Sequence, residues 1–418
     1  MKTICLYFEI HQNIQLKRYR FFDIGTDHYY YDDYENERLI ADIAERSYMP
    51  ALNTLLEMIK SNNGAFKVAF SLSGVGIEQL EIHAPQVLEK LQELNQTGCV
   101  EFLAEPYSHG LASLANEECF AKEVKRQAQK MKEYFGQEPK VLRNVNFSDD
   151  ISLRFSNTDW EGYPLFADNY MDRIANLPEG EKVVNIFMEL SALGIAQPLS
   201  SNILDFFKAL PACAKERGIT FSTPSEICDS FDSVSAVDVP DTLSWNDEER
   251  DCSCWLGNPM QREAFNKLYS VADRVRIADD PRINQDWDYL QASNNFRQMT
   301  TKPSQVGLNR GIYSSPFDAF TNYMNILGDF ISRVNSLYPD SIDNDELSSL
   351  LTTIKNQDEE IEMKSKEIVR LQTKIEKIEA AEEKLRAKLE KTKAPAAKKP
   401  AAKRTAKKAD EAVEEESK

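Results

Sequence analysis

Four short runs of the sequence are apolar on both faces, and they constrain the fold more than any other feature of the chain. They are Thr3 to Ile10, Phe66 to Leu72, Val100 to Ala104 and Val183 to Met188. Strands buried on both faces belong to parallel sheets that helices cover on both sides. A further short strand is predicted at residues 220–222.

The segments between these runs carry apolar residues at spacings of three and four, which predicts helices. These helices are expected at Met49 to Ile59, Ile77 to Leu94, Glu117 to Phe135 and Ser201 to Arg217. Alternating strands and helices indicate βα units around a parallel sheet. Residues 1–230 are therefore predicted to form one α/β domain.

Length and charge narrow the function. The chain has 418 residues, and at roughly 150 residues per domain this predicts two to three domains. Its net charge of −18 disfavours a protein that binds nucleic acid along its whole length. We find no apolar run long enough for a membrane helix or a signal-peptide core. The seven cysteines are an odd number and widely scattered, which predicts reduced thiols and a cytoplasmic protein.

Polar residues follow four of the predicted strands directly. They are His11-Gln12, Ser73-Gly74, Glu105-Pro106 with His109 close behind, and Glu189. The chemistry of a βα barrel takes place at the carboxyl ends of its strands. Any one of these residues could equally be a solvated loop residue. Polar residues at the ends of four strands together predict a site.

The remainder of the chain is predicted to form a helical domain, then a coiled-coil helix, and then a disordered tail. Helical stretches at Met260 to Arg276 and Pro316 to Tyr338 predict an α-helical domain over residues 231–340. Residues 345–390 predict a coiled-coil helix that pairs with a partner or a second copy, although Gln357, Lys364 and Glu382 interrupt its seam. The heptad positions are Leu347, Leu350, Ile354, Ile361, Ile368, Leu371, Ile375, Ile378, Leu385 and Leu389. Residues 391–418 are rich in Lys, Ala, Pro and Glu, which predicts a disordered, solvated tail.

Three separated motifs resemble glycoside hydrolase family 57, in particular its α-amylase-type members. The first is His11-Gln12, where the family usually has proline in place of Asn13. The second is Gly98 to His109 (GCVEFLAEPYSH), and the third is Cys254 to Asn258 (CWLGN) with Gln261. The resemblance covers residues 1 to about 338.

This resemblance implies a fold and an activity. The expected fold is an incomplete (β/α)7-type barrel with a helical domain closing over the site. The expected substrate is α-1,4-glucan such as starch, glycogen or maltooligosaccharide, cleaved with retention of configuration. Retention needs two carboxyl groups about 5 to 5.5 Å apart, which the family supplies as a Glu nucleophile and an Asp acid/base.

The nucleophile is not found at the position that the resemblance implies. The family motif reads Arg-Asn-Thr-Glu-Leu, whereas Arg143-Asn144 is followed by Val145-Asn146-Phe147. The sequence then passes to a segment that lies well downstream in the family. Something on the order of 50 residues is therefore absent near residue 145, more than the roughly 30 of one βαβ unit.

The acid/base position is altered as well. Residues 185–194 (NIFMELSALG) match the family strand, but Glu189 replaces the expected Asp. Four other carboxylates could act as a recruited nucleophile by their position near strand ends, namely Glu101, Glu105, Asp149 and Asp150. The residue types suited to binding a sugar are His11, Tyr107, His109, Trp255, Asn258 and Gln261, with Glu101 and Glu105 at family positions that shape the sugar site.

Three hypotheses follow from these observations. The first is an α-glucan-associated protein that is non-hydrolytic or strongly impaired. The second is an active hydrolase or transferase that uses Glu189 and a recruited nucleophile, and the third is a coiled-coil interaction protein. Trp255 could equally be a core aromatic residue. No cofactor and no metal are expected, because Cys252 and Cys254 lack a second cysteine pair and no phosphate-binding loop occurs.

Overall fold

The computed structural model describes most of the chain in two compact units, Met1–Asp340 and Ser341–Lys418. The described residues are 2–142, 149–233, 238, 241–244, 249–278, 280–303 and 310–338 in the first unit, and 349, 352–353, 356–357, 360–361, 363–372 and 374–375 in the second. A division of the first unit near residue 230 stays a prediction.

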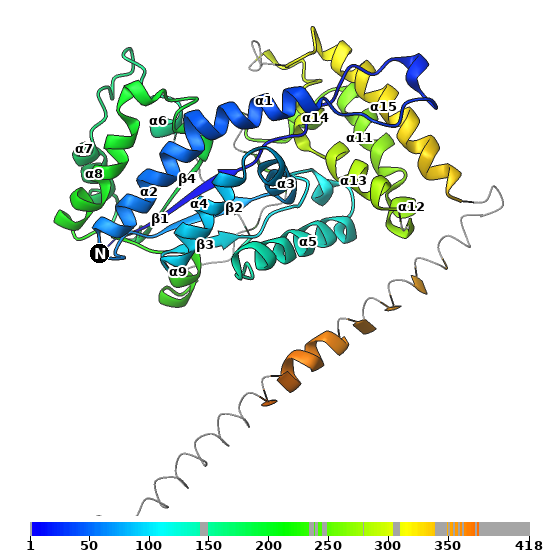
Figure 1. The fold of residues 1–418 in the computed structure, drawn as a ribbon. Coiled ribbons are helices and arrows are strands. Elements are labelled where there is room, and N and C mark those ends of the chain that lie inside the picture. Colours follow the sequence, from blue (N-terminus) through cyan, green and yellow to red (C-terminus); the bar gives the residue numbers. More distant parts are fainter. Residues whose placement is uncertain are drawn as a thin grey trace, which may run out of the picture. The chain divides into compact units, whose positions relative to one another are not determined.

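The described strands form one parallel sheet with β1 at its centre (Figure 1). The strands are β1 (Thr3–Ile10), β2 (Val68–Leu72), β3 (Val100–Leu103), β4 (Val183–Glu189) and β5 (Thr220–Phe221). Their order is β3-β2-β1-β4, and β5 pairs with the first residues of β1. Beyond β3, a parallel bridge joins Ala104 to Leu142. The predicted parallel sheet is therefore confirmed.

Helices cover the outer face of this sheet, which carries the even-numbered residues of β1. The chain places here α1 (Asp33–Ile43), α2 (Met49–Ser61), α3 (Gly74–His83), α4 (Pro85–Gln96), α5 (Glu117–Phe135), α6 (Asp149–Ser152), α7 (Ala167–Ala175) and α8 (Ile203–Glu216). Phe8, Phe70 and Phe102 are fully buried among apolar residues of these helices. The largest hydrophobic core of the chain therefore lies on this side.

One predicted helix is divided in two for a local reason. The single helix expected from Ile77 to Leu94 is wrong, because the chain breaks between α3 and α4 at Ala84-Pro85. Proline has no N–H to continue a helical ladder, and it disfavours helical backbone in the residue before it. The helix expected from Met49 does begin there, as α2 (Met49–Ser61), and a π-helical turn, η2 (Ala44–Tyr48), joins it to α1. The remaining short turns are η1 (Phe21–Asp23), η3 (Ala112–Leu114), η4 (Leu190–Ala192) and η5 (Leu199–Ser201).

The opposite face of the sheet, here called the inner face, carries Cys5, Tyr7 and Glu9 of β1. Cys5 and Tyr7 form a small buried cluster with Ala69, Leu103 and Phe187. Helix α9 (Pro224–Ser230) lies against this face, because its Ile227 packs on the cluster and its Ser225 donates two hydrogen bonds to Glu101.

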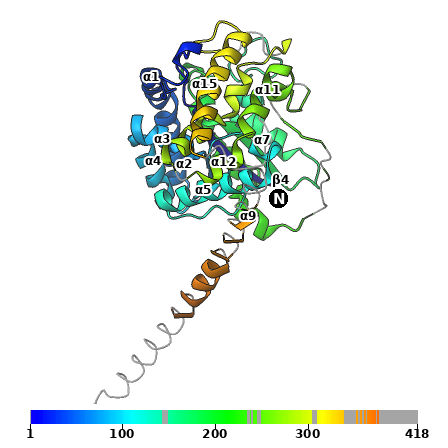
Figure 2. The same cartoon turned by 90° about the vertical axis from the view of Figure 1, so that its right-hand side faces the viewer.

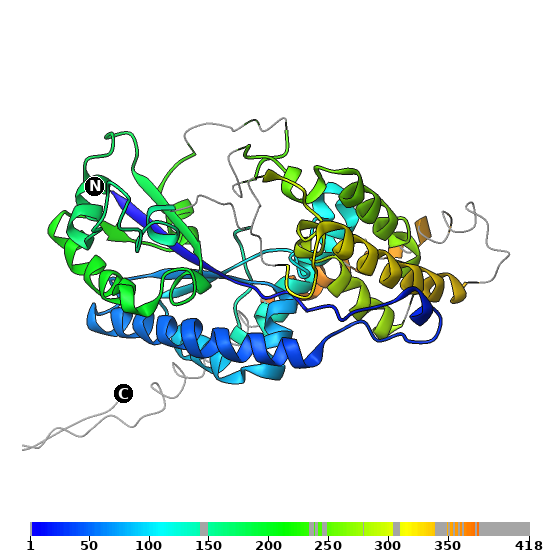
Figure 3. The ribbon, with the colours of Figure 1, turned by 90° about the horizontal axis from the view of Figure 1, so that it is seen from above.

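Further helices build much of the rest of the first unit (Figures 2 and 3). Their apolar residues form a second core. They are α10 (Ser253–Leu256), α11 (Pro259–Tyr269), α12 (Ala272–Ile277), α13 (Pro281–Leu290), α14 (Ser293–Arg297) and α15 (Pro316–Ser336). Helix α15 confirms the helix predicted from Pro316. The stretch predicted from Met260 to Arg276 is two helices, which meet at Ser270-Val271. No helix in the described ranges is long and apolar enough to cross a membrane.

In the second unit the described residues 363–372 are helical. Four of the predicted heptad residues, Ile361, Ile368, Leu371 and Ile375, are 49% to 60% exposed. The other six heptad positions, together with residues 391–418, lie outside the described residues.

The helical core joins the sheet through the loop after β3. An antiparallel bridge pairs Gly110 with Ala292, and the backbone N–H of Ser293 donates to the carbonyl of His109. A Cβ atom on Gly110 would lie 2.6 Å from the backbone oxygen of Gln291. This close approach therefore requires glycine.

We expect Gly110→Ala to lower the free energy of unfolding by about 1–3 kcal/mol, because the new methyl group forces the two segments apart. Chemical denaturation followed by tryptophan fluorescence measures the change. Gly180→Ala is the matched control, since a Cβ there meets nothing within 4 Å, and it should alter stability by less than about 0.5 kcal/mol. Equal effects of the two substitutions would contradict a close backbone approach at Gly110.

Candidate active site

Polar side chains gather on the inner face where the strands end. Side chains alternate along a strand, so Glu9 shares this face with the residues paired to it on the neighbouring strands. Those residues are Ser71 of β2 and Glu189 of β4. Glu105 follows β3 after Ala104 and accepts a hydrogen bond of 2.7 Å from Ser71 Oγ. The sheet thus brings side chains from four strands to one edge.

Two glutamates and two histidines at this edge form what is here called the strand-end cluster: Glu9, His11, Glu105 and His109. The Nδ1 atom of His109 lies 3.3 Å from Glu9 Oε1 and 3.8 Å from Glu105 Oε2. The side chains of Glu9 and Glu105 are 10% and 0% exposed. The predicted site residues His11, Glu105 and His109 are therefore brought together.

The two histidines of the cluster stack face to face. Their ring centroids are 4.0 Å apart and the planes are 18° from parallel. His11 is hydrogen-bonded through both nitrogens, Nδ1 to Ser73 Oγ at 2.6 Å and Nε2 to Asn13 Oδ1 at 2.9 Å. Burial, with the nearby His109 as a second cause, holds the pKa of His11 well below its usual 6.5. Neutral His11 donates from Nε2 to Asn13 and accepts from the Ser73 hydroxyl.

Helix α5 holds the strand ends and the loop of His109 in place. Gln127 donates from its amide nitrogen to the carbonyls of Leu72 and Leu103, at 2.7 and 3.1 Å. One turn earlier, the buried carboxylate of Glu123 accepts from the backbone N–H of Ser108 at 2.7 Å. Because both side chains come from one helix, the ends of β2 and β3 and the following loop form a rigid frame.

A second group of contacts ties Tyr107 to the helical core. Arg126 lies 4.2 Å from the centre of the Tyr107 ring and forms a bidentate ion pair with Asp288, at 2.6 and 2.8 Å. Glu78 accepts hydrogen bonds from the hydroxyl groups of Tyr107 and Tyr289. Burial raises the pKa of Asp288 above its usual range. This network connects the site loop to α13.

Two predicted carboxylates of the sheet lie outside the strand-end cluster. Glu189 ends β4 with an exposed side chain, and its Oε2 accepts from Ser191 Oγ at 3.0 Å. Glu101 lies on β3 and accepts from the backbone N–H and the hydroxyl of Ser225, at 2.9 and 2.5 Å. The structure therefore uses Glu101 to hold the start of α9.

The third sequence motif lies in the helical core. Asn258 caps α11 by accepting from the N–H of Gln261, and the Gln261 side chain accepts in return from the N–H of Asn258. Gln261 is fully buried, and its amide nitrogen donates to the carbonyls of Cys254 and Phe296. Gln261 therefore has a structural role. Trp255 is half-buried against the same core.

Several residues at the expected nucleophile position lie outside the described part of the chain. These are residues 143–148, which include Arg143 and Asn144. Asp149 and Asp150 begin α6, but their side chains are not among those described.

Sequence reasoning missed Glu9, Ser71 and Asn13 as members or supports of the site. Glu9 had a usable signal, because it is the one charged residue in an otherwise apolar strand. Ser71 lies two residues before the strand-end Ser73, on the same face of the strand. Asn13, which replaces the family's usual proline, hydrogen-bonds to His11.

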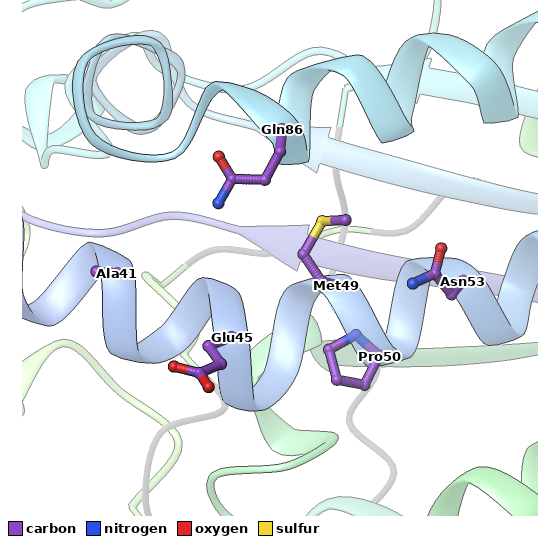
Figure 4. Close-up of a pocket in the computed structure, with 6 residues that line it drawn as sticks. All are labelled: Ala41, Glu45, Met49, Pro50, Asn53 and Gln86. Atoms are coloured by element: carbon purple, nitrogen blue, oxygen red, sulfur yellow. The ribbon is translucent and has the colours of Figure 1, made fainter.

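A shallow pocket on the outer surface is separate from the site. It is lined by Ala41, Glu45, Met49, Pro50 and Asn53 along the α1–α2 helix, with Gln86 of α4 opposite them (Figure 4). None of the strand-end residues lines this pocket, so it is no part of the candidate active site.

Comparison with known proteins identifies the family. The model of glycosyl hydrolase family 57 matches residues 5–147 and 140–240, which together make up more than half of the chain. The chain belongs to this family. A protein of Methanocaldococcus jannaschii named "Putative alpha-amylase" is 29% identical over 405 residues, covering 80% of this chain and 85% of that protein.

Solved structures show the same fold. A GH57-type branching enzyme from Pyrococcus horikoshii matches with a TM-score of 0.56 and 12% identity, over 85% of this chain and 94% of that one. The 4-α-glucanotransferase from Thermococcus litoralis matches with a TM-score of 0.53 and 14% identity, over 78% of this chain. The family 57 protein described here spans 59% of the length of that glucanotransferase. The predicted incomplete (β/α)7-type barrel with helical additions is confirmed.

We expect Arg126→Met to lower the free energy of unfolding by about 3 kcal/mol at about pH 9, because it leaves the carboxylate of Asp288 buried without its partner. The value is at the low end for buried pairs, since the Arg126 side chain is 35% exposed. A raised pKa means that folded Asp288 binds its proton more tightly than the unfolded chain does. Arg126 lowers this pKa in the wild-type chain, so Asp288 of the variant keeps its proton to a higher pH, and the loss should shrink as the pH falls from about 9 to about 6.

Denaturant unfolding at the two pH values measures this effect. Lys125→Met, at an exposed position on the same helix, is the control and should change stability by less than about 0.5 kcal/mol. A loss of the same size at both pH values would show that the Asp288 carboxyl is not its source.

Proposed function

We propose that this protein binds α-1,4-glucan chains and is non-hydrolytic or strongly impaired as a hydrolase. The proposal rests on membership of family 57 and on relatives whose names describe α-glucan enzymes: an α-amylase, a branching enzyme and a 4-α-glucanotransferase. The strand-end cluster supports it, because sugar hydroxyls need hydrogen-bonding groups at the carboxyl ends of the strands.

The observation that carries the proposal is the missing nucleophile after Arg143-Asn144. The family model matches this chain in two pieces that meet at residues 140–147, where the nucleophile strand should continue. The alignment with the Methanocaldococcus jannaschii protein is 405 positions long, but it covers only 80% of the 418 residues of this chain. The alignment therefore includes positions that this chain lacks. Both findings support a loss of residues relative to the family, and the resemblance assigns the attacking Glu to the stretch that follows Arg143-Asn144.

A second candidate function is an active retaining enzyme with a recruited nucleophile. Strand pairing sets Glu9 directly beside Glu189, and neighbouring strands are about 4.8 Å apart, near the separation that retention requires. Against this, Glu9 lies 3.3 Å from His109 within the cluster, whereas exposed Glu189 contacts Ser191. The geometry therefore favours the binding function.

We expect maltoheptaose to bind the protein, by isothermal titration calorimetry, without release of shorter oligosaccharides above a buffer blank. Trp255→Leu should weaken binding by about tenfold, equivalent to roughly 1.4 kcal/mol, because an aromatic face for the sugar ring is lost. Trp160→Leu is the matched control, since Trp160 is also half-buried but packs on the core of the sheet. Equal loss in both variants would remove the role proposed for Trp255.

A mechanism-based fluoroglucosyl inhibitor separates the two candidate functions. An inert binding protein keeps its intact mass after incubation. A covalent glucosyl adduct, with product release that Glu189→Ala abolishes, would overturn the first proposal, and the labelled peptide would identify the recruited nucleophile.

We also propose that the second unit pairs with a second copy of itself. The observation that favours this is the exposure of Ile361, Ile368, Leu371 and Ile375 at heptad spacing in the described helical residues. Isoleucine at the a positions with leucine at d favours parallel two-stranded coiled coils.

A cytoplasmic location also stays a prediction; all seven cysteines are free thiols, as expected for it.

We expect the full chain to be a dimer by light scattering, and deletion of residues 345–418 to leave a monomer. Ile368→Lys should also give a monomer, because it places charge in the apolar seam. Val369→Lys is the matched control, since Val369 is exposed to a similar degree but lies outside the a and d positions. A full chain that is already monomeric would contradict self-pairing.

A further inference from the structure

Three electron-rich side-chain atoms converge where β1 and β3 end. Glu9, Glu105 and His109 each offer one ligand atom, and these atoms all lie within 4.8 Å of one another. The Nδ1 atom of His109 is 3.3 Å from Glu9 Oε1 and 3.8 Å from Glu105 Oε2. Ligands at about 2.1 Å from a tetrahedral ion stand roughly 3.4 Å apart, so the cluster has the dimensions of a metal site.

The environment of His109 Nδ1 is a second and independent observation. This nitrogen is buried, and although it faces two carboxylates it makes no hydrogen bond of acceptable geometry. A buried polar atom of this kind calls for an explanation, and coordination to a metal ion is one of the few available. In neutral imidazole, Nδ1 can offer its lone pair to a cation.

We propose that Glu9, Glu105 and His109 bind a divalent transition-metal ion at the inner face of the sheet. The inference does not rest on glucan binding. The sequence contains no contiguous metal motif, because the ligands come from two separate segments that only parallel strand pairing brings together.

The ligands are held before any ion arrives. Glu9 belongs to the central strand, and Ser71 orients Glu105 through its hydrogen bond of 2.7 Å. The ring of His109 is stacked on His11, which is itself fixed by hydrogen bonds at both nitrogens. The left-handed backbone of His109, with φ +52°, is held where Ser293 donates to its carbonyl. Supports of this kind commonly orient metal ligands.

The ligand types indicate which ions fit. An imidazole with two carboxylates suits Zn²⁺, Mn²⁺ or Co²⁺, whereas Mg²⁺ and Ca²⁺ prefer oxygen ligands alone. Three protein ligands leave at least one coordination position for water or for an oxygen of a bound molecule. With an ion in place, Glu9 would be a ligand and could not attack a sugar.

Zn²⁺ and Co²⁺ are the probes for a test on the full chain. The purified protein is stripped with a chelator, titrated with Zn²⁺ by calorimetry, and analysed for bound metal by mass spectrometry after desalting. We expect one ion per chain and a rise in the unfolding temperature on adding Zn²⁺. Glu9→Gln, Glu105→Gln and His109→Gln should each weaken binding by at least about 100-fold, and Ser71→Ala by roughly 10-fold.

Glu101→Gln is the matched control, because this carboxylate lies on β3 outside the strand-end cluster, bonds to Ser225, and is not one of the three ligands. Circular dichroism verifies that each variant is folded. Failure of the folded wild-type chain to retain Zn²⁺ overturns the proposal. So does uptake that the three ligand variants leave unchanged, or a Co²⁺ spectrum with thiolate charge-transfer bands, which would place the ion on cysteines.

These outcomes are distinct from those of the glucan experiments. Metal retention without maltoheptaose binding would leave the metal site intact and remove the proposed function. Maltoheptaose binding by a chain that holds no metal would do the reverse.

Discussion

The parallel pairing of β1 on both of its edges is the constraint on which the candidate site depends. One edge pairs with β4, and the other pairs with β5 and then with β2, so the neighbouring strands end on the same side of the sheet. Side chains alternate along the strand, and a slip of one residue would exchange Glu9 with an apolar neighbour. The buried outer face, with Phe8 at its centre, therefore determines which polar groups reach the strand ends.

Much of the fold could be predicted because strands buried on both faces have a strong apolar signature. The strand Thr3–Ile10 is confirmed to the residue, and the other long strands differ by two residues or fewer at their ends. The helices were harder to delimit, since periodicity alone does not show where a proline such as Pro85 divides one apolar face into two helices.

The site was partly predictable for a topological reason. His11, Glu105 and His109 converge because parallel strands deliver their carboxyl ends to one edge, and this follows from the strand pattern alone. Which polar residues stabilise the scaffold could not be predicted. Asn258 and Gln261 have groups suited to sugar hydroxyls, yet they form a capping box at the start of α11, which depends on the backbone there. Glu101 similarly accepts hydrogen bonds from Ser225 of α9, a helix that lies more than a hundred residues further along the chain.

The position of α9 bears on how the inner face of an open parallel sheet is covered. An open parallel sheet normally exposes one apolar face and unpaired strand edges, which invite aggregation. Here Ile227 covers the apolar patch around Phe187, and the hydrogen bonds from Ser225 anchor the helix to β3. Detachment of α9 would expose this apolar patch to solvent, so the helix protects the sheet from association through its inner face.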